Sequence, residues 1–150
     1  MKLAEALILR SDLQKRLEQL RQRLCDNALT QEGEQPAEDP QVLLEELNRD
    51  SCQLEELVTR INLTNAVTVQ EGKTLTELLS RRDALALRTS ILRSTLEAAS
   101  RRVSRSTRSE VKIFSTVDVP ELRKKLDDMS RDLRLLDTAI QSCNWLTELK

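Results

Sequence analysis

Gly72, Lys73 and Thr74 stand in succession and are the residues of this chain that most resemble a catalytic motif. A phosphate-binding loop has the form G-x-x-x-x-G-K-[ST] after a buried strand, because several glycine amides must curl around the phosphates. Here Val67 occupies the place of the first glycine, and no other glycine is near. Thr74 and Glu77 instead have the spacing of a capping box at a helix start, with Gly72 in the turn before it. We therefore interpret the stretch as helix punctuation and not as a nucleotide site.

Other familiar catalytic and metal-binding sets lack essential members. The chain has no histidine, which excludes Ser-His-Asp triads and the Glu-x-x-His pairs of di-metal helical bundles. Its cysteines, Cys25, Cys52 and Cys143, are odd in number and widely spaced, as is typical of a reducing cytosol. Cys143 falls on an apolar seam and is expected in the core, whereas the sequence leaves open whether Cys25 and Cys52 are neighbours. We expect no enzyme activity, no cofactor and no metal site.

The densest basic cluster lies in a serine-rich stretch after the third apolar segment. The residues that we predict as candidate contacts for an anion or a partner are Arg101, Arg102, Arg105, Arg108 and Lys112. Such a cluster can bind nucleic-acid phosphates, but it has no interleaved aromatic side chains for base stacking, and the formal net charge of the chain is −1. Arginines near a helix C-terminus also bond local carbonyls and favour the helix dipole. We favour this structural role, with phosphate or nucleic-acid binding as the alternative.

Long helices must position all of these residues. The 150 residues include two glycines and three prolines, and 33% are charged, a composition typical of helical proteins. Apolar residues recur at 3.5-residue spacing in four segments, the pattern of coiled-coil seams. We predict an all-α fold in which four long helices form an antiparallel helical bundle or coiled coil. The predicted helices, within a single domain over 1–150, lie near 2–29, 39–66, 74–103 and 119–144.

The fourth segment has the most regular seam and the widest apolar stripe. Its seam residues are Leu122, Leu126, Met129, Leu133, Leu136, Ile140 and Cys143. Leu135, Ala139 and Trp145 lie beside this seam, so the apolar stripe is wider than one neighbouring helix requires. We therefore expect a homo-oligomer, with another protein as the second candidate partner and nucleic acid as a disfavoured one.

The segments between the helices carry clear breaking signals. The acidic stretch 31–40 contains three breaking residues, and it ends with Asp39 as a predicted N-cap before Pro40. Asp118 and Pro120 give the same signal before the fourth helix. The β-branched segments 66–69 and 111–116 are candidates for a short β-hairpin.

Charged residues interrupt the seams and divide the chain into an acidic and a basic part. Arg10, Asp50 and Arg82 occupy seam positions, where a charge lowers stability unless it is paired and therefore often fixes register or partner. Residues 30–60 carry nine acids and two arginines, whereas 80–112 carry nine bases and three acids. We expect the second and third helices to neutralise each other, with different partners for the two parts as the alternative.

No transmembrane segment is expected, because no stretch approaches about 18 uncharged apolar residues. The first residues, MKLAEALILRSD, make a poor signal peptide, since they contain Glu5 and few apolar residues. Together with the cysteine usage, this predicts a cytoplasmic protein.

Six blocks carry a family resemblance over nearly the whole chain, from Met1 to about Leu149. They are MKLAEALILRSDLQKRLEQLRQRL, QEGEQPAEDP, INLTNA, LTELLSRRDAL, SRSEVKIFSTVDV and NWLTEL. Read together, they resemble a small bacterial family of uncharacterised proteins that carry the name septicolysin. The resemblance implies a helical cytosolic bacterial protein of undetermined function. Ser106 stands where members of that family tend to carry tyrosine, which argues against base stacking in the arginine-rich stretch.

The family name implies a membrane-acting toxin, and the residues argue against that activity. A pore former needs membrane β-hairpins or amphipathic helices with large apolar faces, whereas these helices have narrow seams flanked by mixed charge. Our leading hypothesis is a non-enzymatic helical interaction or scaffold protein that self-associates through its seams. A septicolysin-like toxin is the alternative.

Overall fold

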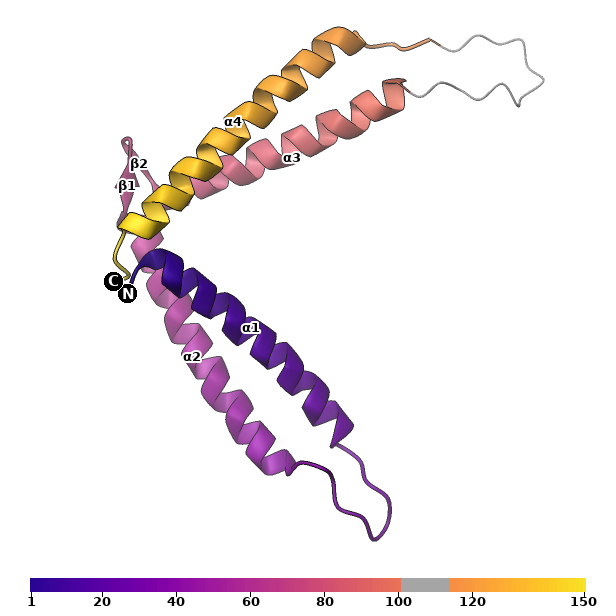
Figure 1. Ribbon diagram of the computed structural model, residues 1–150, viewed down its shortest axis with the longest axis vertical. Coiled ribbons are helices and arrows are strands. Elements are labelled where there is room, and N and C mark those ends of the chain that lie inside the picture. Colours follow the sequence, from indigo (N-terminus) through magenta and orange to yellow (C-terminus); the bar gives the residue numbers. More distant parts are fainter. Residues whose placement is uncertain (101–113) are drawn as a thin grey trace, which may run out of the picture. The chain divides into compact units, whose positions relative to one another are not determined.

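The computed structural model describes residues 1–100 and 114–150, which form four helices and one two-stranded sheet (Figure 1). The elements are α1 (Leu3–Asp26), α2 (Pro40–Val67), β1 (Val69–Gln70), β2 (Lys73–Thr74), α3 (Leu75–Ser100) and α4 (Val119–Leu146). The predicted all-α class with four long helices is confirmed. The chain divides into an N-terminal unit, Met1–Thr76 with Gln141–Lys150, and a central unit, Glu77–Ile140. We describe each unit by itself, and the expectation of a single domain stays a prediction.

Two helix starts have the predicted N-caps. Asp39 precedes α2, and its Oδ1 accepts a hydrogen bond from the Gln41 N–H at 2.9 Å, with Pro40 as the first helical residue. Asp118 precedes α4, and its Oδ1 accepts a hydrogen bond from the Glu121 N–H at 3.0 Å. Both side chains satisfy N–H groups that lack a partner within the helix, which is why these helices begin where they do.

The Gly72 stretch forms the turn of a β-hairpin that leads into α3. The φ angles of Glu71 and Gly72 are 51° and 79°, and two consecutive positive values are what a two-residue type I′ turn requires. The Leu75 N–H then donates a hydrogen bond to the Thr68 carbonyl at 2.9 Å, which closes the hairpin where α3 begins. Thr74 directly precedes α3, at the predicted start of the helix, and the capping box of Thr74 with Glu77 stays a prediction.

The strand partner in this hairpin differs from the prediction. The antiparallel register pairs Val69 with Thr74 and Gln70 with Lys73, so β1 overlaps the predicted segment 66–69 and takes β2 as its partner. Residues 114–116 form no strand, and 111–113 lie outside the described residues. A two-residue turn brings its flanking residues together with little loss of chain entropy, whereas the predicted pairing would have to close a loop that includes the whole of α3.

In the N-terminal unit, α1 and α2 lie side by side and bury their apolar seams between them (Figure 1). The side chains that are at most 1% exposed include Leu3, Leu13, Leu20, Leu43 and Ile61. Their 3.5-residue spacing places them on one stripe of each helix, and the two stripes cover each other. This part of the predicted coiled-coil packing therefore buries alternate seam residues between two helices, while Leu17 and Leu47 are half-buried.

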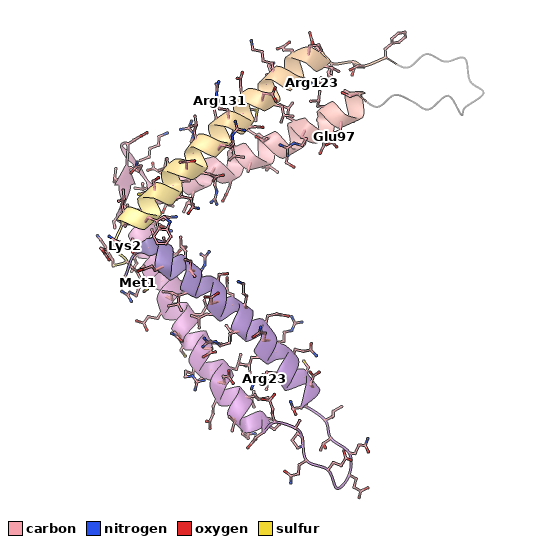
Figure 2. The ribbon with its side chains drawn as sticks, viewed as in Figure 1. Met1, Lys2, Arg23, Glu97, Arg123 and Arg131 are labelled. Atoms are coloured by element: carbon pink, nitrogen blue, oxygen red, sulfur yellow. The ribbon has the colours of Figure 1, made fainter. Side chains whose placement is uncertain are left out.

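The first and last residues of the described chain are joined within the same unit. The Leu3 N–H donates to the Thr147 carbonyl and the Leu149 N–H to the Met1 carbonyl, both at 2.9 Å. Lys2, which Figure 2 labels at the start of α1, forms a 2.7 Å ion pair with Glu148. These contacts hold the residues that follow α4 against the start of α1.

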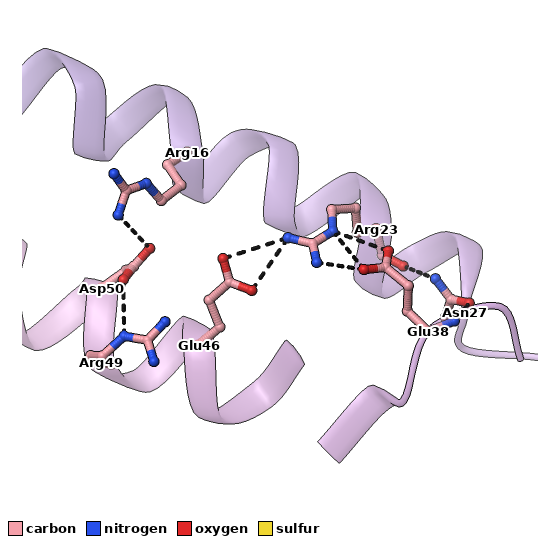
Figure 3. A network of polar contacts seen from close by, with 7 residues as sticks. All are labelled: Arg16, Arg23, Asn27, Glu38, Glu46, Arg49 and Asp50. Atoms are coloured by element: carbon pink, nitrogen blue, oxygen red, sulfur yellow. Dashed lines mark hydrogen bonds and ion pairs between the residues drawn. The ribbon is translucent and has the colours of Figure 1, made fainter. Parts of the chain in front are cut away.

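A polar cluster joins the end of α1 to the loop before α2 and to α2 itself (Figure 3). Arg23 donates from Nε to Glu38 Oε2 at 3.0 Å and from Nη1 to Glu46 Oε2 at 3.3 Å. Asn27, which is 8% exposed, donates from Nδ2 to the Arg23 carbonyl and accepts the Glu38 N–H, both at 2.9 Å. Because Asn27 makes these contacts outside a helix, α1 ends at Asp26, earlier than the predicted residue 29.

Asp50 is the buried charge of the α1–α2 seam. It is 1% exposed, and its carboxylate lies 3.7 Å from Arg16 Nη1 and 3.5 Å from Arg49 Nε (Figure 3). Its Oδ2 has no hydrogen-bond partner among the described residues, and neither has the buried Nε of the predicted seam residue Arg10. Arg82, the third charged residue predicted at a seam position, forms a 2.7 Å ion pair with Asp83. The two arginines that flank Asp50 are exposed, so the buried member of this cluster carries the desolvation cost.

Two substitutions distinguish the buried acid from its exposed partner. Arg16→Met leaves the Asp50 carboxylate buried with less compensation, so we expect the free energy of unfolding to fall by about 1–3 kcal/mol. Asp50→Leu replaces the buried charge by an apolar side chain of similar size, and we expect it to be neutral or stabilising. Urea unfolding followed by circular dichroism measures both. A larger loss for Asp50→Leu than for Arg16→Met would contradict this account.

Glu38 gives the cluster a pH dependence of known sign. Its hydrogen bond to the Arg23 guanidinium holds the pKa of Glu38 below the ordinary value of 4.5. A carboxylate with a lowered pKa stabilises the fold above its unfolded-state pKa, and this contribution disappears as the pH falls through the folded-state value. We therefore expect Glu38→Gln to lower the melting temperature at pH 7 and to lower it progressively less below about pH 4.5. An equal difference at pH 7 and pH 3 would show that the effect is not electrostatic.

Candidate protein-interaction surface

The seam of α4 is only partly covered within the central unit. Leu122, Leu126, Met129, Leu133 and Leu136 are all half-buried, although they form the most regular apolar repeat of the sequence. In this unit Ile140 is the one α4 residue below 9% exposure. Cys143, at 5% exposure, belongs to the N-terminal unit and is a core residue as predicted. The described part of α4 therefore keeps much of its apolar stripe accessible to water.

The α3 side of this hairpin is similar. Leu78, Thr89 and Leu96 are buried, at 7%, 3% and 9% exposure, while Leu87 and Ile91 are 63% and 58% exposed. Side chains of α3 and α4 line one groove in the central unit, and Figure 1 shows the two helices. Buried and half-buried residues alternate along the seam of α1, as Leu13 and Leu17 do, whereas the α4 seam residues from Leu122 to Leu136 are all half-buried.

A groove marks the open part of this seam. It has a volume of about 510 Å³, and the side chains that line it come from both helices. They include Arg88, Ile91 and Leu92 of α3 and Lys125, Asp128 and Met129 of α4. Its floor is thus apolar and its rim is charged, which is the usual construction of a protein-binding groove.

The rim charges are only partly neutralised within the chain. Lys125 pairs with Glu121 at 2.6 Å, and the hydrogen bond between them raises the pKa of Lys125 above its ordinary value. Asp128 has a weaker neighbour, Arg131, at 3.6 Å. Arg88 forms no ion pair with any described residue. The groove therefore offers both a cationic and an anionic group to a ligand.

The exposed apolar side chains extend this surface beyond the groove. Leu87 precedes Ile91 by one helical turn and lies on the same side of α3. Leu135, which is 64% exposed, follows Asp128 by seven residues and therefore lies on the same side of α4. We call the groove with Leu87 and Leu135 the α3–α4 face. Sequence reasoning identified Leu135 as surplus to the seam but gave no indication of the groove, because its charged rim residues look like ordinary surface positions.

The described residues bring no metal-binding group together. No group of three or more Cys, Asp or Glu side chains with metal-binding geometry occurs in 1–100 or 114–150. Cys25 and Cys52 are exposed free thiols. Arg23 contacts Glu46 and Arg16 contacts Asp50, so α1 and α2 run antiparallel. In this register Cys25 lies opposite residues near the start of α2. Cys52 lies more than one turn further along α2, so the two cysteines are not neighbours. Two acids of α2, Glu46 and Asp50, take arginine partners from α1, a pairing that the sequence did not indicate.

The predicted anion or partner contacts, Arg101, Arg102, Arg105, Arg108 and Lys112, lie outside the described residues. Their role stays a prediction from the sequence. Within the residues that are described, none of the helices combines the length and the apolar character that a bilayer crossing requires.

The fold and this surface define an all-α protein with a candidate protein-interaction face. Residues 10–149 match a family of unknown function, DUF6847, and the chain belongs to this family. It is also similar to a solved structure, described as a functionally unknown conserved protein from Corynebacterium diphtheriae, with 44% sequence identity and a TM-score of 0.95. The match covers 100% of this chain and 99% of that one. No curated protein matches the chain.

These findings agree with the part of the sequence resemblance that implied an uncharacterised helical family. Neither the family match nor the solved structure carries the name septicolysin. The similar solved structure therefore supports the fold of this chain, and neither match assigns an activity to the chain.

The arginine-rich stretch can be tested without knowing its conformation. If Arg105 and Arg108 have the structural role that we favour, the double change to alanine should lower the free energy of unfolding by about 1–3 kcal/mol. The wild-type chain should then bind no DNA or RNA in a low-salt fluorescence anisotropy titration. An unchanged melting temperature, together with nucleic-acid binding that weakens by about one power of salt per phosphate contact, would establish the alternative.

Proposed function

We propose that this chain is a non-enzymatic helical interaction protein that self-associates through its coiled-coil seams. The observation that supports this proposal is the half-buried seam of α4 in the central unit. An amphipathic helix buries its apolar stripe against other elements, and a stripe left open on an otherwise charged surface marks an interaction site.

The energetic reason for association is the apolar area that water still reaches. Ile91 and Leu135 are 58% and 64% exposed, and burying apolar surface contributes about 25 cal/mol per Å². The five α4 seam side chains from Leu122 to Leu136 are half-buried as well, so covering the whole stripe removes further apolar area from water. Association must exceed the cost of lost rotational and translational freedom, and a continuous stripe meets that requirement better than scattered side chains.

The residue types support a binding role over catalysis. The sequence has no histidine, and two of the charged side chains around the groove form intrahelical pairs, Lys125 with Glu121 and Asp128 with Arg131. Such charged pairs keep the edge of the groove hydrated. They also help to determine which partner binds, as the charges beside a coiled-coil seam do. The free thiols support a cytoplasmic location for this interaction protein.

Self-association is tested by sedimentation equilibrium over a concentration series from about 1 to 100 μM. We expect the mean mass to rise from that of the 17.2 kDa chain toward a multiple of it. A constant 17.2 kDa mass over the whole range would contradict the proposal.

A liposome assay distinguishes the proposal from a membrane-acting toxin. Dye-loaded liposomes incubated with the protein between pH 5 and pH 8 should release no dye, because the proposal requires protein and not lipid to cover the open seam. Dye release would favour the toxin.

A further inference from the structure

We infer that the α3–α4 face is the self-association interface and that its occupant is the α3–α4 face of a second copy of this chain. This inference rests on the proposed function and adds which surface associates, with what, and in which arrangement. The two copies pack around a twofold axis that runs along the groove, so that α3 of each copy lies over α4 of the other.

The size of the face matches what a stable dimer needs. α3 has 26 residues, which gives a length of about 39 Å. Two helices side by side, each about 10 Å across, present a face on the order of 800 Å². Stable protein interfaces bury about 800 Å² on each partner. One copy of this face therefore suffices, without any contribution from the N-terminal unit.

The face is complementary to itself in shape and polarity. It contains a groove lined by apolar side chains such as Leu92 and Met129, and it also contains the exposed apolar side chains Leu87 and Leu135, which can fill a groove. A twofold interface needs both features on one surface, because each copy supplies the side chains that enter the other copy's groove. The result is a four-helix bundle in which the seam residues Leu92 and Met129 of both copies share one core.

The charges determine the arrangement of the two copies. Arg88 and Asp128 line the same groove from opposite helices, and Arg88 has no ion pair among the described residues. A twofold axis along the groove leaves each residue at its own level and places Arg88 of one copy over Asp128 of the other. Two such pairs form at once, and every helix then has antiparallel neighbours, as in ordinary four-helix bundles.

The charge balance of the face favours a second copy over a partner of one strong charge. α3 carries four arginines and three acids, and α4 carries five bases and five acids. A surface with both signs in nearly equal numbers complements an identical surface, whereas a strongly acidic or basic partner would meet repulsion at half of the positions.

A pair of matched substitutions locates the interface. Ile91→Glu places a charge on the α3–α4 face, and Leu63→Glu places the same charge at an equally exposed leucine of α2 in the N-terminal unit (58% and 59% exposed). Both positions are exposed helical sites, so circular dichroism should show an unchanged helix content. We expect sedimentation equilibrium to show self-association at least about tenfold weaker for Ile91→Glu and unchanged for Leu63→Glu. Equal effects of the two changes would overturn the assignment of the interface.

A charge exchange tests the arrangement. Arg88→Glu places two acids opposite each other in each predicted pair, and Asp128→Arg places two arginines there, so each variant alone should associate at least about tenfold more weakly than wild type. An equimolar mixture should recover association, because both pairs in the mixed dimer then join opposite charges. Failure of the mixture to exceed the two separate variants would overturn the proposed pairing.

The outcomes separate this inference from the proposed function. If wild type self-associates and Ile91→Glu has no effect, the proposed function stands and the α3–α4 face is the wrong surface. If wild type remains a monomer at all concentrations, both fail together.

Discussion

A helix in a two-helix hairpin has one neighbour, and a single neighbour covers only a narrow apolar stripe. The N-terminal unit satisfies this constraint, since Leu13 and Leu20 of α1 are at most 1% exposed against α2. In the central unit α4 carries a wider stripe, and Leu126 and Leu133 stay half-buried. The two hairpins therefore differ in what they leave for other molecules, although their helices have similar lengths and similar repeats. The candidate interaction surface follows from this difference and not from any special residue type.

Polar contacts complete the closed hairpin where apolar packing ends. Arg23 joins α1 to Glu46 of α2 and to Glu38 of the loop, and Glu148 joins the last residues of the chain to Lys2. These groups are partly exposed, so their Coulomb energies are modest. Their positions matter more than their energies, because they fix the ends of the helices and so the level at which the two seams meet. The buried carboxylate of Asp50 adds to this selection, since a shifted register would separate it from Arg16.

Local signals in the sequence were sufficient for the helices and insufficient for the contacts between them. The caps at Asp39 and Asp118 depend on residues two or three positions away, and the turn at Gly72 depends on its own backbone freedom. The hairpin partner of β1 was misassigned because β-branched composition indicates a strand but not its pairing. The contacts of Arg23 join residues that are 15 and 23 positions apart. At such separations the helical repeat of the sequence does not show which residues are in contact.

The groove shows why the site was harder to predict than the fold. An apolar repeat predicts that a stripe will be buried, but how far it is buried depends on how many helices surround it, and that number is a tertiary property. The surplus residues beside the seam, such as Leu135, were the one sequence signal for an additional neighbour, and the structure leaves this side chain 64% exposed. A stripe that is too wide for the helices of its own unit, and that carries balanced charge at its margins, has its simplest complement in a copy of itself. The width of the apolar stripe, compared with the number of helices available to cover it, is thus the quantity that links this sequence to association.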